Sequence, residues 1–177
     1  VLVAELSRID GIERLRYTTS HPRDMTDDPI AAHAGHPKLM PYLHLPFQAG
    51  SDRILAAMNR KHTAADYVRL AERIREARPD IALSTDIIVG FPGETHAEFE
   101  ELLDWIDAAK LDRVGCFKYS PVEGARANEL ADPVPDEVKE ERYARFMERA
   151  QAISTARLTA KVGKRMRVLV DRIDDSV

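Results

Sequence analysis

Cysteine is almost missing from this sequence, since its 177 residues contain only Cys116. A disulfide framework is thereby excluded, and so small a use of cysteine favours a reducing, cytoplasmic setting. No apolar run approaches the roughly 20 residues of a membrane helix, and residues 1–5 do not form an export signal. A formal charge of −4 argues against a uniformly basic nucleic-acid coat but is compatible with a local basic patch.

Metal and phosphate motifs are missing as well. The histidines show no His-Glu-x-x-His or similar spacing, so no metal ligand is assigned among His21, His33, His36, His44, His62 and His96. There is no Gly-x-x-x-x-Gly-Lys-Ser/Thr phosphate loop. Cys116 lies in an apolar segment and is predicted to be a small core residue and not a nucleophile. The sequence also lacks an initiator methionine, so we expect it to begin inside a longer protein.

What the sequence does contain is an alternation of apolar strand patterns and amphipathic helix patterns. Strand patterns separated by helices of this length predict right-handed crossovers and a parallel sheet, hence an α/β fold. Four strand–helix steps are visible, fewer than a full eight-stranded barrel needs. The expected strands cover 13–19, 42–47, 81–89, 113–119 and 165–173, and the expected helices cover 51–58, 63–78, 95–109 and 136–160.

The carboxyl ends of these strands carry polar or glycine residues. Ligands of parallel sheets bind at that edge, so these positions are the candidate site. The candidates are Ser20, Gln48, Ser51, Gly90, Phe91, Pro92, Gly93, Glu94, Lys118 and Ser120. Gly90 and Gly93 give the backbone freedom to approach a bulky ligand, and Thr95 with Glu98 forms a capping box for the next helix.

Structural roles compete with ligand binding at each of these positions. The sequence Gly-Phe-Pro-Gly is also what a tight connection between a strand and a helix needs, and Ser51 is equally well explained as the N-cap of its helix. Arg53 has the position to clamp a carboxylate, although surface arginines are common. For Lys118 the alternative is a structural one: successive side chains at a strand end point to opposite faces of the sheet, and Lys118 would simply point to one of them.

Three runs of residues, at 17–22, 41–55 and 88–95, resemble the radical S-adenosylmethionine methylthiotransferases. The runs read Tyr-Thr-Thr-Ser-His-Pro, Pro-Tyr-Leu-His-Leu-Pro-Phe-Gln-Ala-Gly-Ser-Asp-Arg-Ile-Leu and Ile-Val-Gly-Phe-Pro-Gly-Glu-Thr. The resemblance covers essentially the whole chain. It implies the C-terminal part of a partial (βα)6 radical-SAM barrel at 1–132, a connecting helix at 133–162, and the first strand of a truncated TRAM-like RNA-binding domain at 163–177.

The same resemblance implies the cofactors. Family members bind S-adenosylmethionine and [4Fe-4S] clusters, and the candidate residues at the strand ends would contact S-adenosylmethionine. The cluster motif Cys-x-x-x-Cys-x-x-Cys is absent from this chain, so the chain supplies no metal ligand and should be inactive by itself. No catalytic residue is assigned. The parent enzyme would need a reductant for the cluster, would be monomeric and would not contact a membrane.

Two branches of the family resemble different parts of the chain. Residues 2–98 resemble the branch that modifies isopentenyl-adenosine next to the anticodon of tRNA (MiaB-like). Residues from 111 onward resemble the branch that modifies an aspartate of a small-subunit ribosomal protein (RimO-like). We hypothesise a recombined or misassembled chain joined near 88–95. A tRNA methylthiotransferase fragment is favoured, with the ribosomal-protein enzyme and a non-catalytic RNA-binding or ribosome-binding remnant as alternatives.

Overall fold

A three-stranded parallel sheet forms the centre of the molecule. The computed structural model describes residues 2–18, 21–166 and 168–170. The strands are β1 (Tyr42–His44), β2 (Ala82–Val89) and β3 (Arg113–Lys118), in the spatial order β1-β2-β3. His44 lies opposite Ser84, and Ile88 lies opposite Phe117. The predicted α/β class and the parallel sheet are confirmed.

Helices connect the strands, so that each crossover returns the chain to the same end of the sheet. They are α1 (Leu2–Ser7), α2 (Asp27–Gly35), α3 (Asp52–Ala57), α4 (Ala64–Ala77), α5 (His96–Ala109) and α6 (Asp136–Thr159), with short 3-10 helices at Pro22–Asp24 and Arg126–Glu129. The predicted capping box of α5 is present, because Thr95 Oγ1 accepts from the Glu98 amide while the Glu98 carboxylate accepts from the Thr95 amide. None of the described helices is long and apolar enough to cross a membrane.

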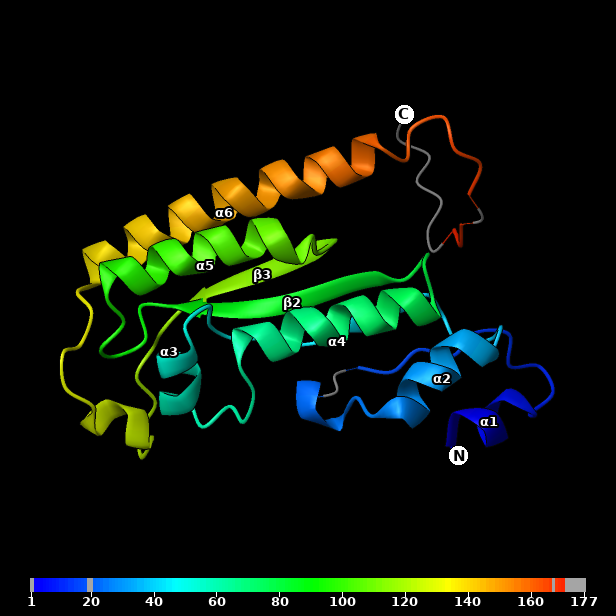
Figure 1. The fold of residues 1–177 in the computed structure, drawn as a ribbon, viewed down its shortest axis with the longest axis horizontal. Coiled ribbons are helices and arrows are strands. Elements are labelled where there is room, and N and C mark those ends of the chain that lie inside the picture. The colour runs from blue at the N-terminus through cyan, green and yellow to red at the C-terminus, as the bar shows by residue number, and fades with distance from the viewer. Residues whose placement is uncertain (1, 19–20, 167, 171–177) are drawn as a thin grey trace.

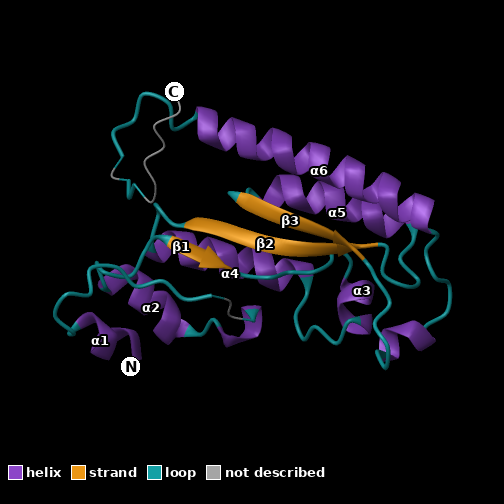
Figure 2. Ribbon diagram, turned by 180° about the vertical axis from the view of Figure 1, so that it is seen from behind, coloured by secondary structure: helices purple, strands orange, loops and turns teal. Residues whose placement is uncertain are grey.

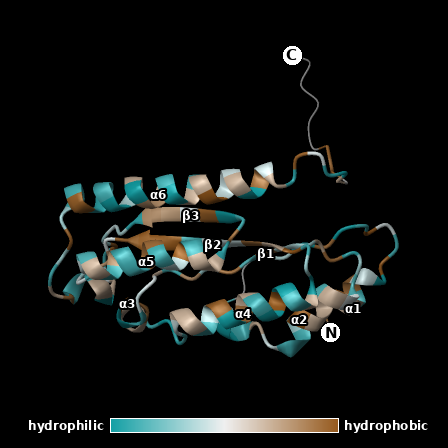
Figure 3. Ribbon diagram, turned by 45° about the horizontal axis from the view of Figure 1, so that its top comes forward, coloured by the Kyte–Doolittle hydropathy of each residue, from teal (hydrophilic) through white to brown (hydrophobic). Residues whose placement is uncertain are grey.

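One face of the sheet is covered by helices and the other is open. Alternate residues of β2, namely Leu83, Ile87 and Val89, are fully buried beneath α4 and α5. The long helix α6 lies along β3 and α5, and its Phe146 completes the same core. From behind, the strands lie in front of α4 and α5, so the second face of the sheet points toward the viewer (Figure 2). The apolar colouring gathers on β2 and β3, while α5 and α6 show hydrophilic outer surfaces (Figure 3).

An aromatic cluster fixes the loop that follows β1. The ring of Phe47 stacks on Trp105 with a centroid distance of 4.0 Å, and Tyr67 packs against both. The buried Tyr67 hydroxyl donates to the Leu45 carbonyl at 2.9 Å. Because buried polar groups must be paired, this bond both satisfies the hydroxyl and holds the strand end against α4.

Two predicted strands were wrong where the structure describes them. Residues 13–18 make only an isolated parallel bridge between Leu15 and Leu39. The pairing consists of the bonds from the Leu15 amide to Lys38 and from the Met40 amide to Leu15, which is too short to form a ladder.

The strand expected at 165–173 is likewise missing from its described part. Residues 164–166 and 168–170 are irregular and largely exposed, and they form no strand pairing with the other described residues. Residues 167 and 171–173 of that prediction lie outside the described residues. The limits at 132 and 162 and the TRAM-like character of the last segment stay predictions.

Candidate cofactor site at the strand ends

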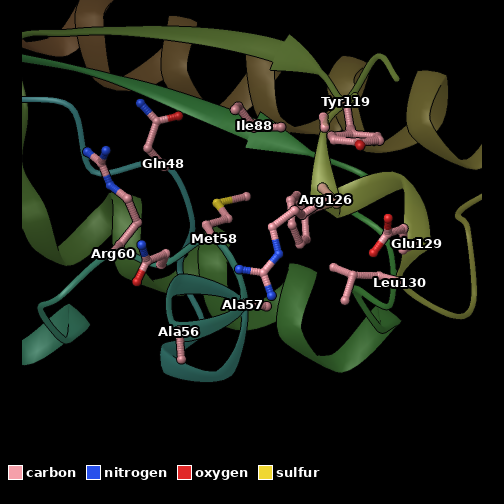
Figure 4. A pocket seen from close by; sticks show the side chains of 14 residues that line it. Gln48, Ala56, Ala57, Met58, Arg60, Ile88, Tyr119, Arg126, Glu129 and Leu130 are labelled. Atoms are coloured by element: carbon pink, nitrogen blue, oxygen red, sulfur yellow. The ribbon is translucent and has the colours of Figure 1, made fainter. Parts of the chain in front are cut away.

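A cavity of about 920 Å³ opens at the carboxyl ends of β2 and β3. Its volume lies within the range of small-molecule sites, which is roughly 300–1,000 Å³. The walls come from the loop after β1, the end of α3 with the loop that follows it, the end of β2 with its turn, and the segment after β3 (Figure 4). The lining residues are Gln48, Ala56, Ala57, Met58, Asn59, Arg60, Ile88, Phe91, Tyr119, Ala125, Arg126, Ala127, Glu129 and Leu130.

Two of the predicted site residues, Gln48 and Phe91, line this cavity. Gln48 has a φ of 88°, a left-handed conformation that is strained for a residue with a Cβ. Its backbone nevertheless continues the pairing with β2, because its amide donates to the Asp86 carbonyl at 3.0 Å. Phe91 packs edge to face against Tyr119 with centroids 5.3 Å apart. The cavity therefore has an amide at one end and an aromatic wall at the other.

Gly90 and Glu94 lie on the side of the turn that faces α6. A Cβ on Gly90 would lie 2.4 Å from Lys139 Cγ, so the missing side chain makes room for α6. Oε2 of Glu94 accepts from the Gly90 amide at 2.7 Å and from Arg142 Nη1 at 2.6 Å. Burial raises the pKa of the Glu94 carboxyl, and the bonds from Gly90 and Arg142 oppose that rise. In this structure Glu94 thus closes the turn against α6.

Ser51 and Arg53 converge on Glu98. Ser51 is the N-cap of α3, and its hydroxyl donates to Glu98 Oε1 at 2.8 Å. Arg53 makes a bidentate pair with the same carboxylate, with both contacts at 2.7 Å, and donates to the Gly93 carbonyl. Hydrogen bonds from Arg53, Thr95 and Ser51 lower the pKa of Glu98 to about 2. Arg53 does clamp a carboxylate as predicted, and the carboxylate is one of the chain's own.

The remaining predicted residues are scattered around the turn. Pro92 is buried, and the Gly93 amide donates to the Asp132 carbonyl at 2.8 Å. Lys118 pairs with Glu140 of α6, away from the cavity. Ser120 is exposed beside Tyr119. Ser20 lies outside the described residues.

Sequence reasoning missed the basic groups of the cavity. Arg60 donates to the Pro46 carbonyl at 2.9 Å, and its Nε has no hydrogen-bond partner among the described residues. Burial lowers the pKa of the Arg60 guanidinium. The Arg126 side chain extends across the cavity toward Met58 and Ala57 (Figure 4). No motif marks Arg126, and its only signal in the sequence is its position soon after a strand end.

Cys116, the one cysteine of the sequence, does not line this cavity. Cys116 is buried in β3 on the helix side, and burial raises the pKa of its thiol to about 12. In the parts of the chain that the structure describes, no three His, Cys, Asp or Glu side chains gather as metal ligands. Because an iron–sulfur cluster requires several thiolates, these 177 residues do not fit one. The cavity does fit a cofactor of nucleoside size, with its aromatic wall, one amide and two guanidinium groups.

Comparison with known proteins agrees with this geometry. The model of the radical SAM superfamily matches residues 1–106. A curated relative from Cereibacter sphaeroides (strain ATCC 17029), named tRNA-2-methylthio-N(6)-dimethylallyladenosine synthase, is 56% identical over 171 residues, which is 97% of this chain and 39% of the relative. A relative of the same name from Jannaschia sp. (strain CCS1) is 51% identical over 171 residues, which is 97% of this chain and 37% of the relative.

The chain therefore spans about two fifths of the length of these relatives. Among solved structures, the radical SAM enzyme coproporphyrinogen III oxidase from Escherichia coli superposes with a TM-score of 0.59 and 19% identity, over 77% of this chain and 31% of that one. This likeness concerns the fold. With a family model that covers more than half of its residues, the chain belongs to the radical SAM superfamily.

Proposed function

We propose that this chain is part of an S-adenosylmethionine-dependent methylthiotransferase that modifies an isopentenylated adenosine of tRNA. The relatives that carry the corresponding name share half or more of their aligned residues with it. The single observation that supports the proposal in the structure is the cavity at the strand ends, the position at which ligands of parallel α/β folds bind.

The lining of the cavity suits the parts of S-adenosylmethionine. Phe91 and Tyr119 provide an aromatic wall for the adenine, and the Gln48 amide is placed to hydrogen-bond the ribose or the carboxylate. The Arg126 guanidinium carries the charge that the cofactor's carboxylate needs. A cluster that reduces the cofactor would require cysteines from outside these 177 residues.

The ribosomal-protein alternative receives no support from the relatives. Their alignments cover 171 of the 177 residues, so they extend through both halves of the chain and across the hypothesised join. A single tRNA-type parent accounts for the whole match. The RimO-like interpretation of the second half, and with it the recombined chain, is unsupported.

The test uses the complete reading frame that contains this chain. The purified protein, reconstituted with iron and sulfide and supplied with a reductant, should form methylthio-adenosine in isopentenylated tRNA, detected by mass spectrometry of nucleosides. Methylthio-aspartate in the ribosomal protein instead of this product would support the alternative. S-adenosylmethionine binding without either product would leave only the binding remnant.

A cofactor-site variant links this test to the cavity. Arg126→Gln should weaken S-adenosylmethionine binding by about tenfold in calorimetry, since a charge-assisted hydrogen bond is lost. Arg149→Gln is the matched control, because Arg149 lies on α6 and pairs with Asp107, away from the cavity. Equal affinities for the two variants would contradict the assignment of the cavity to the cofactor.

The other expectations for the parent protein belong to the same proposal. A tRNA partner, a reductant for the cluster, a monomeric state and a cytoplasmic location all accompany tRNA modification. The TRAM-like segment at 163–177 would add an RNA contact.

A further inference from the structure

A second cavity, which we call the α4 pocket, lies beside α4 and apart from the cavity at the strand ends. Its volume is about 360 Å³, at the lower end of the range for small-molecule sites. Its walls come from the N-terminal half of α4, the end of the α3–α4 loop, and the 3-10 helix at Pro22–Asp24 with the residue that follows it. Among the described residues, none lines both cavities, so the two are separate sites.

The rim of the α4 pocket is basic. Four basic side chains line it against a single carboxylate, that of Asp66, and they belong to Arg23, Lys61, Arg69 and Arg73. The carboxylate is already engaged, because its Oδ2 accepts from the Thr63 amide at 2.9 Å and its Oδ1 accepts from Arg69. In a chain with a net charge of −4, so local an excess of positive charge indicates an anionic ligand.

Two of the four cations have no carboxylate partner. Arg23 and Lys61 form no ion pair with any described residue, and both are exposed. The other two make surface pairs, Arg69 with Asp66 and Arg73 with Asp27 of α2. The Arg69 and Arg73 side chains are 65% and 52% exposed, and exposed pairs contribute little to stability. All four cations can therefore turn toward an anion in the pocket at little cost to the fold.

An apolar floor lies between the basic groups. Four of the lining residues are buried there, namely Pro22, Met25, Tyr67 and Leu70. The pocket thus combines a cationic rim with a floor that excludes water. A ligand that has both a phosphate and a less polar face fits this combination, and one nucleotide unit of an RNA strand is such a ligand.

The α3–α4 loop connects the α4 pocket with the cavity at the strand ends. Residues 58–60 of this loop line the strand-end cavity, and residues 61–62 line the α4 pocket. The His62 ring lies 5.8 Å from the Phe47 ring and 5.4 Å from the His21 ring, centroid to centroid, so that packing on two sides holds the loop. A linear ligand with one unit at the cofactor cavity needs to cross only this loop to reach the basic rim. This continuity favours an RNA strand over a small free anion.

We propose that the α4 pocket binds the sugar–phosphate backbone of the RNA substrate beside the modified nucleotide, with Arg23 and Lys61 holding a phosphate. The contact is to the backbone and not to a base edge, so it adds affinity and orientation without reading the sequence. This inference rests on the proposed function and identifies where the strand next to the target nucleotide is held.

The experiment measures RNA binding by the protein expressed from the complete reading frame. The probe is a fluorescein-labelled anticodon stem–loop with isopentenyl-adenosine at the target position, followed by fluorescence anisotropy at several salt concentrations. Arg23→Gln and Lys61→Gln should each weaken binding by about three- to tenfold and reduce the slope of log affinity against log salt by about 0.7–1. S-adenosylmethionine binding should change less than about twofold, since both residues lie outside the lining of the strand-end cavity.

Matched controls separate the pocket from a general loss of charge. Arg149→Gln and Lys110→Gln remove exposed cations that line neither cavity, and both should keep the affinity and the salt slope of the unsubstituted protein. Arg23→Lys retains the positive charge and should retain the salt slope, which a merely structural role of Arg23 does not predict.

A series of modified RNAs locates the contact. Each stem–loop carries one methylphosphonate near the target nucleotide, which removes the charge of a single phosphate. The unsubstituted protein should lose about three- to tenfold in affinity at the contacted phosphate, whereas Arg23→Gln should lose nothing further there, because the interaction is already absent. If Arg23→Gln and Lys61→Gln respond to every methylphosphonate as the unsubstituted protein does, the proposed phosphate contact does not exist.

The outcomes separate this inference from the proposed function. Unchanged RNA affinity and salt slope in both variants, with methylthio-adenosine still formed, overturn the backbone site and leave the methylthiotransferase intact. Absence of methylthio-adenosine in the unsubstituted protein overturns the proposed function, while the methylphosphonate series still decides the phosphate contact. Circular dichroism melts identify a variant that fails to fold, and the series on the unsubstituted protein and the remaining variant then decides.

Discussion

The two sides of the turn after β2 differ in how their charged groups are satisfied. On the side of α6, Glu94 pairs with Arg142, and Lys118 pairs with Glu140. On the side of the cavity, Arg126 has no ion-pair partner among the described residues, and Arg60 reaches only a backbone carbonyl. The first side is closed by ion pairs, whereas the second carries guanidinium groups that have no acidic partner among the described residues.

Most residues of the turn motif at 90–94 have a structural role and do not face the cavity. The glycines and the glutamate of Gly-Phe-Pro-Gly-Glu shape the turn and attach it to α6, while the side chain that faces the cavity is Phe91. Charged residues that already have partners stabilise the fold, and those without partners can contribute binding energy. Substitutions on the two sides should therefore separate stability from binding.

Arg142→Met tests the closed side and has the largest expected effect. It leaves the Glu94 carboxylate buried without its cation, since the two side chains are 6% and 3% exposed. Loss of one partner of a buried pair costs about 3–5 kcal/mol. Urea denaturation should show this decrease, whereas Arg145→Met, whose side chain is 37% exposed, should cost less than about 1 kcal/mol. Equal costs would mean that the Glu94–Arg142 pair is not a structural joint.

Gly90→Ala tests the same joint through the backbone. The new Cβ would lie 2.4 Å from Lys139 Cγ at a φ of 73°, so we expect a loss of about 2–3 kcal/mol from clash and strain together. Gly93→Ala is the control, because its φ of 81° is similar but its Cβ would meet the nearest atoms at 3.8 Å. It should lose only about 1–2 kcal/mol in the same denaturation experiment. A larger loss at Gly93 would contradict the close approach of α6.

Local sequence patterns predicted most of the fold but only part of the site. The Thr95–Glu98 capping box, the N-cap at Ser51 and the apolar strand of β2 depend on neighbours in sequence, and all are present. The partner of Glu94 comes from 48 residues further along, which no local pattern encodes. Ser84 and Asp86, two polar residues inside an apolar strand, were the available sign of the open face.

Glu98 gives a pH test of the network beside the turn. Its pKa falls from an ordinary 4.5 to about 2 in the folded protein, so its stabilising contribution is complete above about pH 4.5 and is lost as the pH falls toward 2. Because its partner Arg53 is 58% exposed, we expect a contribution of about 1–2 kcal/mol. In Arg53→Gln the free energy of unfolding should decline less between pH 5 and 2 than in the unsubstituted protein. An unchanged decline would mean that the Arg53–Glu98 pair is not its cause.

Gln48→Gly tests the open side and should have the smallest effect on stability. The φ of 88° at Gln48 strains a residue with a Cβ, and glycine removes this strain while increasing the entropy of the unfolded chain. These effects oppose each other, so the free energy of unfolding should stay within about 1 kcal/mol. Lys110→Gly is the matched control, since Lys110 has a φ of 49° at the end of α5, outside the cavity lining. Calorimetry should show S-adenosylmethionine binding weakened only by Gln48→Gly. Equal S-adenosylmethionine affinity in the two variants would mean that the left-handed conformation of Gln48 only shapes the backbone and does not contribute to ligand binding.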